Sequence, residues 1–354
     1  MNKTFWNRFL DSSSDNRKSK TCTERRRSIQ NRKWVGIVAI VLTFIFGGAV
    51  AEAQQAKVYR VGVILQGGLF YAMVDGLRDG LKELGFVEGK QFLLEIRDTR
   101  GDLEAVDETA RSLEREKVNL LYTVTTSVTI AASRSTANTP IVFNAGTDPT
   151  IVGLVESFAK PGGRLTGVHF LTTDLTGKRL EILRDLFPKL HRVVTFYNPS
   201  NPSATESAKQ GREAARHLQV QFIERHVASV KELQAALLTL RAGEADAYVD
   251  VSDAMVASQG QLIIDTAKAK RLPTMFQEQS PVAKGGLASY GVSYHEVGRL
   301  SAKYIQRILT GTRSQDLPVE TVRKIDLVLN LRTAREIGLT VPPNVLTQAD
   351  RVIK

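Results

Sequence analysis

The residues best suited to chemistry in this 354-residue chain are polar side chains that follow short apolar runs. The strongest candidates for binding a ligand are Gln66, Thr126, Ser127, Asp148, Asn198, Asp253 and Glu278, with Thr125, Thr147, Ser200, Asn201, Ser252 and Gln277 beside them. Hydroxyl groups at the start of a helix suit an anion, because free backbone N–H groups and the helix dipole both favour negative charge. Carboxylates suit a cation. The set as a whole therefore indicates a site for a zwitterion, such as an amino acid.

Each of these residues also has a simpler explanation. Ser, Thr, Asp and Asn are the side chains that most often cap the N-terminus of a helix. A residue such as Asp148 or Asp253 can serve as a cap without touching a ligand. The recurrence of polar residues after several strands supports a binding site better than any single member does.

The usual signatures of catalysis are missing. The chain has no GxGxxG, P-loop, HExxH or GxSxG motif. Its five histidines are scattered without metal-ligand spacing, and its single cysteine is Cys22. We therefore expect no catalytic residue, no metal and no cofactor. An enzyme that uses Asp253 and Glu278 as an acid/base pair stays as an alternative, although nothing in the sequence fixes their separation.

Short apolar runs alternate with amphipathic helical segments along the chain. The predicted strands are residues 58–65, 92–96, 118–124, 141–143, 192–197, 220–226, 247–251, 274–276, 287–289 and 325–331. Near-continuous apolar strands between helices are typical of parallel sheets covered on both faces. The pattern predicts an α/β fold of two doubly wound, Rossmann-like lobes, and a TIM barrel is the competing fold.

The stretch from Ile141 to Val168 combines a candidate site with a candidate hinge. A strand at residues 141–143 leads into a polar turn, and Asp148 and Pro149 predict the start of a helix to about Ala159. Breakers then follow at Gly162 and Gly163. Glycine adopts backbone angles that other residues avoid, so we expect a crossover between the lobes here. A second crossover is expected at Tyr290 and Gly291, and a third at Pro318.

The N-terminus reads as an export signal. Residues 34–50 carry no charge, basic residues precede them, and Ala51-Glu52-Ala53 supplies a small-residue cleavage pattern. We expect residues 1–53 to be a signal peptide that is cut after Ala53. An uncleaved membrane anchor is the alternative, because a run of this length can span a bilayer.

The net charge of +11 does not indicate nucleic-acid binding. Residues 1–53 hold a net +6 of it. After residue 53 no run of Lys and Arg with interleaved aromatic residues appears, so we expect no nucleic-acid partner. A repressor would also need a helix-turn-helix at the N-terminus, where this chain has an apolar segment instead.

Long segments of the chain resemble a known family. They include ELGFVEGKQFLLEIRD, PIVFNAGTDPTIVGLVESFAKPGGRLTGV, GKRLEILRDLFPKLHRVVTFYNPSNPSA, DAYVDVSDAMVAS, GGLASYGVSYHEVGR and LPVETVRKIDLVLNLRTAREIGL. Over residues 57–343 the chain is similar to the substrate-binding proteins of ABC transporters, in the branch with the type I periplasmic-binding fold. The resemblance implies two lobes joined by three crossovers, which close on a small molecule without catalysis or a cofactor.

The resemblance also implies boundaries, a location and partners. The expected parts are residues 1–53 (signal peptide), 57–163 (first lobe), 164–290 (second lobe), 291–318 (return to the first lobe) and 319–354 (return to the second lobe and tail). We expect a monomeric periplasmic receptor that captures an amino acid or related molecule for an inner-membrane ABC permease. The alternative is a membrane-tethered ligand sensor of the same fold.

Several positions match the polar positions of the family's cleft. Asp148, Asn198, Asp253 and Glu278 do so, and Ser127 stands where the family usually has a Thr-Pro step after its third strand. Here Val128 replaces the proline, and Thr125 and Thr126 stand where glycine is common. The floor of the pocket is therefore expected to differ from that of relatives.

Overall fold

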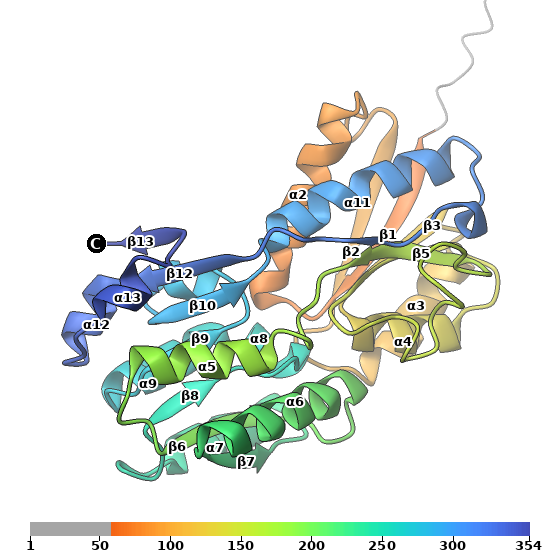
Figure 1. Ribbon diagram of the computed structural model, residues 1–354. Coiled ribbons are helices and arrows are strands. Elements are labelled where there is room, and N and C mark those ends of the chain that lie inside the picture. The colour runs from red at the N-terminus through yellow and green to blue at the C-terminus, as the bar shows by residue number, and fades with distance from the viewer. Residues whose placement is uncertain (1–57) are drawn as a thin grey trace, which may run out of the picture. The chain divides into compact units, whose positions relative to one another are not determined.

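The computed structural model describes residues 58–354, and the predicted signal peptide lies outside the described residues. Two separate sheets with helices on both faces form the described chain (Figure 1). The predicted α/β fold with two parallel-sheet lobes is confirmed, and the eight-stranded barrel is not formed. Among residues 58–354, no helix is both long and apolar enough to cross a membrane.

The first sheet has six strands, all parallel, in the order β11-β5-β4-β3-β1-β2. Helices α2 and α11 pack on one face and α3 and α4 on the other. These elements, which we call lobe I, are β1 (Tyr59–Leu65), α2 (Tyr71–Glu83), β2 (Phe92–Asp98), α3 (Ala105–Arg115), β3 (Leu120–Val124), α4 (Thr126–Ser135), β4 (Ile141–Ala145), β5 (Leu165–His169), α11 (Tyr294–Leu309) and β11 (Glu320–Thr321).

The second sheet has seven strands in the order β13-β12-β10-β9-β8-β6-β7, and the β10–β12 pair is antiparallel. Helices α5 and α6 cover one face and α7, α8 and α9 the other. These elements, which we call lobe II, are α5 (Thr176–Leu186), β6 (Arg192–Tyr197), α6 (Pro202–Leu218), β7 (Gln221–His226), α7 (Val230–Thr239), β8 (Ala247–Val249), α8 (Ala254–Ser258), α9 (Gly260–Ala269), β9 (Thr274–Phe276), α10 (Ser280–Ala283), β10 (Ala288–Gly291), β12 (Asp326–Asn330), α12 (Leu331–Glu336), α13 (Pro343–Leu346) and β13 (Arg351–Ile353).

Three connections join the lobes, at residues 170–175, 292–293 and 322–325. The second lies directly after Tyr290 and Gly291, close to the predicted position. The first does not lie at Gly162 and Gly163, because β5 pairs with β4 and still belongs to lobe I. The third follows β11 rather than Pro318, because β11 pairs with β5. The predicted boundaries at residues 163 and 318 are therefore too early.

The predicted helix over residues 149–159 is absent. This segment forms successive turns instead. Asp148 accepts hydrogen bonds from the N–H and hydroxyl groups of Thr150, so the expected capping bond forms without a helix behind it. Gly153 has a φ of 70°, and the N–H of Glu156 donates to the carbonyl of Pro161. These two features turn the chain back before a second helical turn forms.

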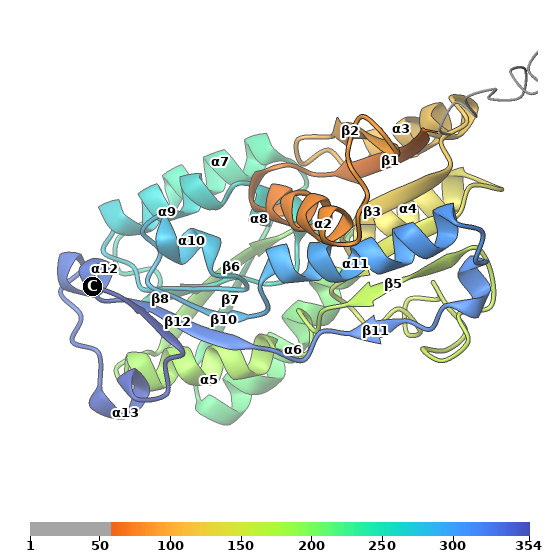
Figure 2. The ribbon, with the colours of Figure 1, turned by 90° about the horizontal axis from the view of Figure 1, so that it is seen from above.

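Helices α2 and α11 lie side by side in Figures 1 and 2, although more than 200 residues separate them in sequence. Their backbones touch at glycines. A Cβ atom on Gly76 would lie 1.9 Å from the carbonyl oxygen of His295, and one on Gly298 would lie 1.9 Å from that of Met73. Although α11 follows most of lobe II in the sequence, this contact packs it against lobe I. The contact also positions Tyr294, the first residue of α11.

We expect Gly298→Ala to lower the free energy of unfolding by about 1–3 kcal/mol, because the added methyl group would force two helix backbones apart. Urea denaturation followed by circular dichroism measures the change. Gly177→Ala is the matched control. In α5 the new Cβ would meet Ala214 at an ordinary 3.5 Å, so we expect a gain of about 0.4–1 kcal/mol. Equal stability of the two variants would contradict the close helix contact.

Candidate functional site

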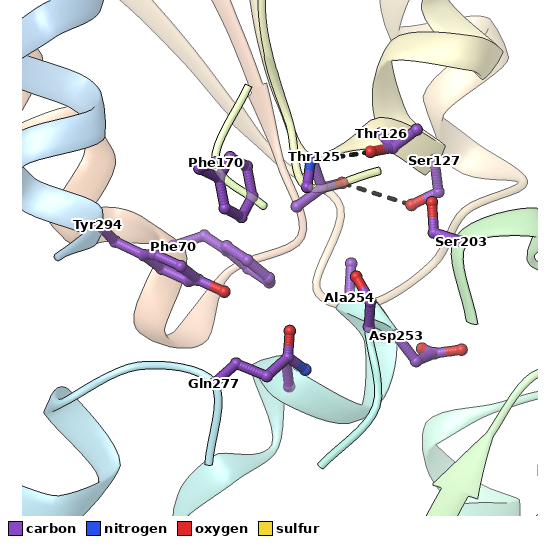
Figure 3. Close-up of a pocket in the computed structure, with 13 residues that line it drawn as sticks. Phe70, Thr125, Thr126, Ser127, Phe170, Ser203, Asp253, Ala254, Gln277 and Tyr294 are labelled. Atoms are coloured by element: carbon purple, nitrogen blue, oxygen red, sulfur yellow. Dashed lines mark hydrogen bonds between the residues drawn. The ribbon is translucent and has the colours of Figure 1, made fainter. Parts of the chain in front are cut away.

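A pocket lies between the carboxyl ends of the strands of both lobes, with a cavity volume of about 20 Å³. A cavity of this size holds about one water molecule, so an amino acid can enter only when the lobes or the lining side chains move apart. The residues around it are Phe70, Thr125, Thr126, Ser127, Gly146, Phe170, Ser203, Ser252, Asp253, Ala254, Ala257, Gln277 and Tyr294 (Figure 3). A larger outer groove shares Ser127 and Asp253 with the pocket, so the two spaces are adjacent.

The N-terminus of α4 opens on the pocket from lobe I. Thr125 caps this helix, with its hydroxyl 3.5 Å from the N–H of Val128. The N–H groups of Thr126 and Ser127 precede the first intrahelical bonds, and the described chain gives them no acceptor. Free donors at the positive end of a helix favour an anion. This end of the pocket can therefore hold a carboxylate.

Thr125 has an unusual backbone conformation, with a φ of 89°. A β-branched residue at positive φ is strained, and such strain is concentrated at ligand and active sites. Thr126 has a different role, because its hydroxyl oxygen accepts from the N–H groups of Gly146 and Thr147. It ties the start of α4 to the turn after β4. Ser127 has its hydroxyl 3.3 Å from that of Thr125.

Lobe II contributes Ser203 and Asp253 at the other side of this polar end (Figure 3). The hydroxyl of Ser203 is buried and has no hydrogen-bond partner in the described chain. Asp253 caps α8 through the N–H of Val256 and also accepts from the N–H of Asn198 at 2.8 Å. Burial raises the pKa of Asp253, although these donors oppose the rise. Asp253 is the acidic residue of this lining, and it also acts as a cap.

Three aromatic rings form the opposite end of the pocket. Tyr294 stacks on Phe70, with ring centroids 5.6 Å apart and an interplanar angle of 11°. Phe170 meets Tyr294 edge to face at 5.5 Å. The sequence analysis did not predict these residues, because only polar side chains were expected to bind the ligand. Their positions were nevertheless recognisable, since Phe170 directly follows β5 and Phe70 closely follows β1.

Gln277 lies beneath the aromatic rings and joins the pocket to a buried polar network. Its Nε2 donates to the Asp250 carboxylate at 2.9 Å and to the carbonyl oxygen of Val251 at 2.7 Å. Asp250 also accepts from the hydroxyl of Tyr248. Burial raises the pKa of Asp250 to about 7, against these donors and the nearby charge of Arg179.

The seven predicted ligand residues are distributed unevenly. Thr126, Ser127 and Asp253 line the pocket. Gln66 and Asn198 line the outer groove instead.

Two predicted carboxylates lie on neither surface. Asp148 is held by Thr150, and Glu278 is buried beside the N–H of Ser280 at 2.7 Å. Between residues 58 and 354, no three His, Cys, Asp or Glu side chains meet in a metal-binding arrangement.

Comparison with proteins of known structure supports the same architecture. A conserved domain protein from Vibrio cholerae is 26% identical, with a TM-score of 0.77 over 84% of this chain and 99% of that one. A domain from Streptococcus pneumoniae in complex with L-Trp is 24% identical, with a TM-score of 0.74 over 83% of this chain and 99% of that one. Both are built on the same two-lobed fold.

Sequence comparison identifies one similar protein and the family to which the chain belongs. A tyrosine-binding protein of Clostridioides difficile is 25% identical over 265 residues, which are 75% of this chain and 76% of that protein. Residues 59–353 match the family model for ABC transporter substrate binding proteins. Because this match spans nearly all of the described chain, the protein belongs to the ABC transporter substrate binding protein family.

Proposed function

We propose that this substrate-binding protein captures an aromatic amino acid between its two lobes and passes it to the permease of an ABC importer. One observation carries the proposal: a single buried pocket has free helix N–H groups, a carboxylate and three aromatic rings on its wall. The names of two similar proteins support it, since one is a tyrosine-binding protein and the other was crystallised with L-Trp.

The pocket suggests how the ligand lies. Its carboxylate faces the N–H groups of Thr126 and Ser127, with the hydroxyl groups of Ser127 and Ser203 nearby. Its ammonium faces Asp253. Its ring extends toward Phe70, Phe170 and Tyr294, where aromatic pairs contribute beyond simple burial. Asp148 and Glu278, the other predicted carboxylates, have no part in this arrangement.

We infer that the protein is a receptor rather than an enzyme. The acid/base alternative needs Asp253 and Glu278 to face the same substrate, but only Asp253 lines the pocket. The proposed place of work is the periplasm, reached through the N-terminal export signal. The proposed form is a monomer that docks on an inner-membrane permease.

The binding proposal predicts that L-Tyr, L-Trp or L-Phe stabilises the fold in a thermal-shift screen over amino acids, sugars and purines. A ligand at 100 times its Kd adds about 2.7 kcal/mol. Asp253→Asn keeps a capping side chain but removes the charge. We expect it to weaken amino-acid binding about tenfold or more, because charge-assisted hydrogen bonds contribute roughly 1.5–3 kcal/mol.

A ligand without the amino group is the control for this variant. 3-Phenylpropanoate should bind Asp253→Asn at least as tightly as wild type, because it has no ammonium group to lose and its carboxylate no longer meets a negative charge. Glu278→Gln neutralises a buried carboxylate outside the pocket lining and should cause a smaller loss for amino acids. Equal affinity of wild type and Asp253→Asn for the amino acid would show that Asp253 does not hold the ammonium. A stabilising sugar or purine, without any amino acid, would overturn the proposal.

A receptor that encloses its ligand must bend at the connections between its lobes, residues 170–175, 292–293 and 322–325. We expect a saturating ligand to reduce the radius of gyration measured by small-angle X-ray scattering. Gly162 and Gly163 lie within lobe I, so Gly163→Ala should leave this contraction intact; no Cβ clash is expected there. Binding without contraction would mean that the lobes do not close.

The export proposal predicts a mature protein that begins at Gln54. Intact mass spectrometry of protein from the periplasmic fraction measures this directly. Ala53→Leu should block cleavage, because signal peptidase sites require small residues. A full-length chain in the membrane fraction of wild-type cells would instead support the tethered sensor.

A further inference from the structure

Gln277 presents a fixed hydrogen-bond acceptor to the aromatic end of the pocket. Its amide nitrogen donates one hydrogen to Val251 and the other to Asp250. The backbone carbonyl of Val251 can only accept, so the nitrogen must face it whatever the protonation state of Asp250. The carbonyl of Val251 therefore determines which way the Gln277 amide faces.

The carbonyl oxygen of Gln277 is left on the pocket side. Within residues 58–354 the structure gives this Oε1 atom no hydrogen-bond partner, and Figure 3 shows it directed at the space below Phe70 and Tyr294. Gln277 as a whole residue is only 5% exposed. A ligand that fills the pocket therefore covers this oxygen and excludes the water that would otherwise pair with it.

The other polar groups of the pocket lie where the proposed function places the charged groups of the ligand. Ser127, Ser203 and Asp253 gather at the end opposite the rings (Figure 3), where the proposed function places the carboxylate and ammonium of the ligand. Gln277 lies below Phe70 and Tyr294, on their side of the pocket (Figure 3). The ligand atom that comes nearest to it belongs to the aromatic side chain rather than to the amino-acid backbone.

We propose that Gln277 determines specificity by accepting a hydrogen bond from an O–H or N–H group on the ligand's ring. The pocket then prefers L-Tyr or L-Trp to L-Phe. Asp250 is a positioning residue, because it holds the Gln277 amide without touching the ligand. The inference rests on the proposed function. Its physical basis is the cost of burying an unpaired acceptor, which L-Phe would incur and a donor-bearing ring would not.

Isothermal titration calorimetry with L-Tyr, L-Trp and L-Phe tests the proposal. Wild type should bind L-Tyr or L-Trp at least about tenfold more tightly than L-Phe, since leaving a buried acceptor unpaired is typically worth that factor. Gln277→Met has a similar shape but no acceptor, and it should reduce the preference to about twofold or less. Gln210→Met in α6, outside the pocket lining, should keep the wild-type preference.

Variants of Asp250 test its positioning role. Asp250→Ala removes one of the two acceptors that hold the Gln277 amide, so the preference should fall part of the way toward that of Gln277→Met. Asp250→Asn retains an oxygen for the amide and should restore the preference. Melting curves establish that each variant is folded before its ratio of affinities is compared.

The outcomes separate this inference from the proposed function. Equal affinity of wild type for all three amino acids would overturn the inference and leave the proposed function standing. An equal loss of L-Tyr and L-Phe binding in Gln277→Met would also overturn it, because Gln277 would then hold the common ammonium group. If no aromatic amino acid binds to wild type, the proposed function fails and the inference fails with it.

Discussion

A fully buried guanidinium holds together the connections on which the two-lobed fold depends. Arg179, in the first helix of lobe II, donates from Nη1 to the carbonyl of Thr172 and from Nε to that of Tyr290. Thr172 lies in the first connection, and Tyr290 lies just before the second. Arg179 therefore fixes two chain segments, distant in sequence, at the point where the lobes meet. The proposed closure of the lobes would take place around this anchor.

Burying this charge is unfavourable, and the acidic groups around it offset only part of the penalty. Burial lowers the pKa of Arg179 to about 10, while the nearby acidic groups oppose the change. Its Nη2 has no hydrogen-bond partner in the described chain. Asp250 is among the acidic groups that favour the charged guanidinium, and it also holds Gln277. Arg179 at the connections and Gln277 at the pocket thus share one carboxylate, that of Asp250.

The sequence predicted the parts of the fold that depend on local pattern. The apolar runs of β1, β3 and β4 are fully or largely buried, as expected for parallel strands covered on both faces. It misplaced the first and third connections because strand pairing is not local. The five residues of β5 look like the start of a new lobe, and only their ladder with β4 shows that they complete the first one. The helix contact through Gly76 and Gly298 also could not be predicted, because neither segment alone shows that the two helices meet.

The candidate site shows the same division. Polar residues after strands correctly indicated the edge of the sheet where the pocket lies. They did not indicate which of these side chains line the pocket. Asp148 and Glu278 have the right chemistry, but neither lines the pocket as Asp253 does; their carboxylates accept from the N–H groups of Thr150 and Ser280 instead. The aromatic end was missed because Phe70, Phe170 and Tyr294 read as ordinary core residues until three distant segments come together.

The start of α4 has the same single capping bond as α7 and α11, but its first residues line the pocket. The Thr125 hydroxyl reaches only the N–H of Val128, and at the long distance of 3.5 Å. The hydroxyl of Thr126 accepts from the turn after β4 instead of from its own helix. A strained residue at φ 89° therefore begins a helix whose first N–H groups face the pocket. A cap that satisfied these donors would stabilise the helix more and leave nothing to attract the carboxylate of a ligand.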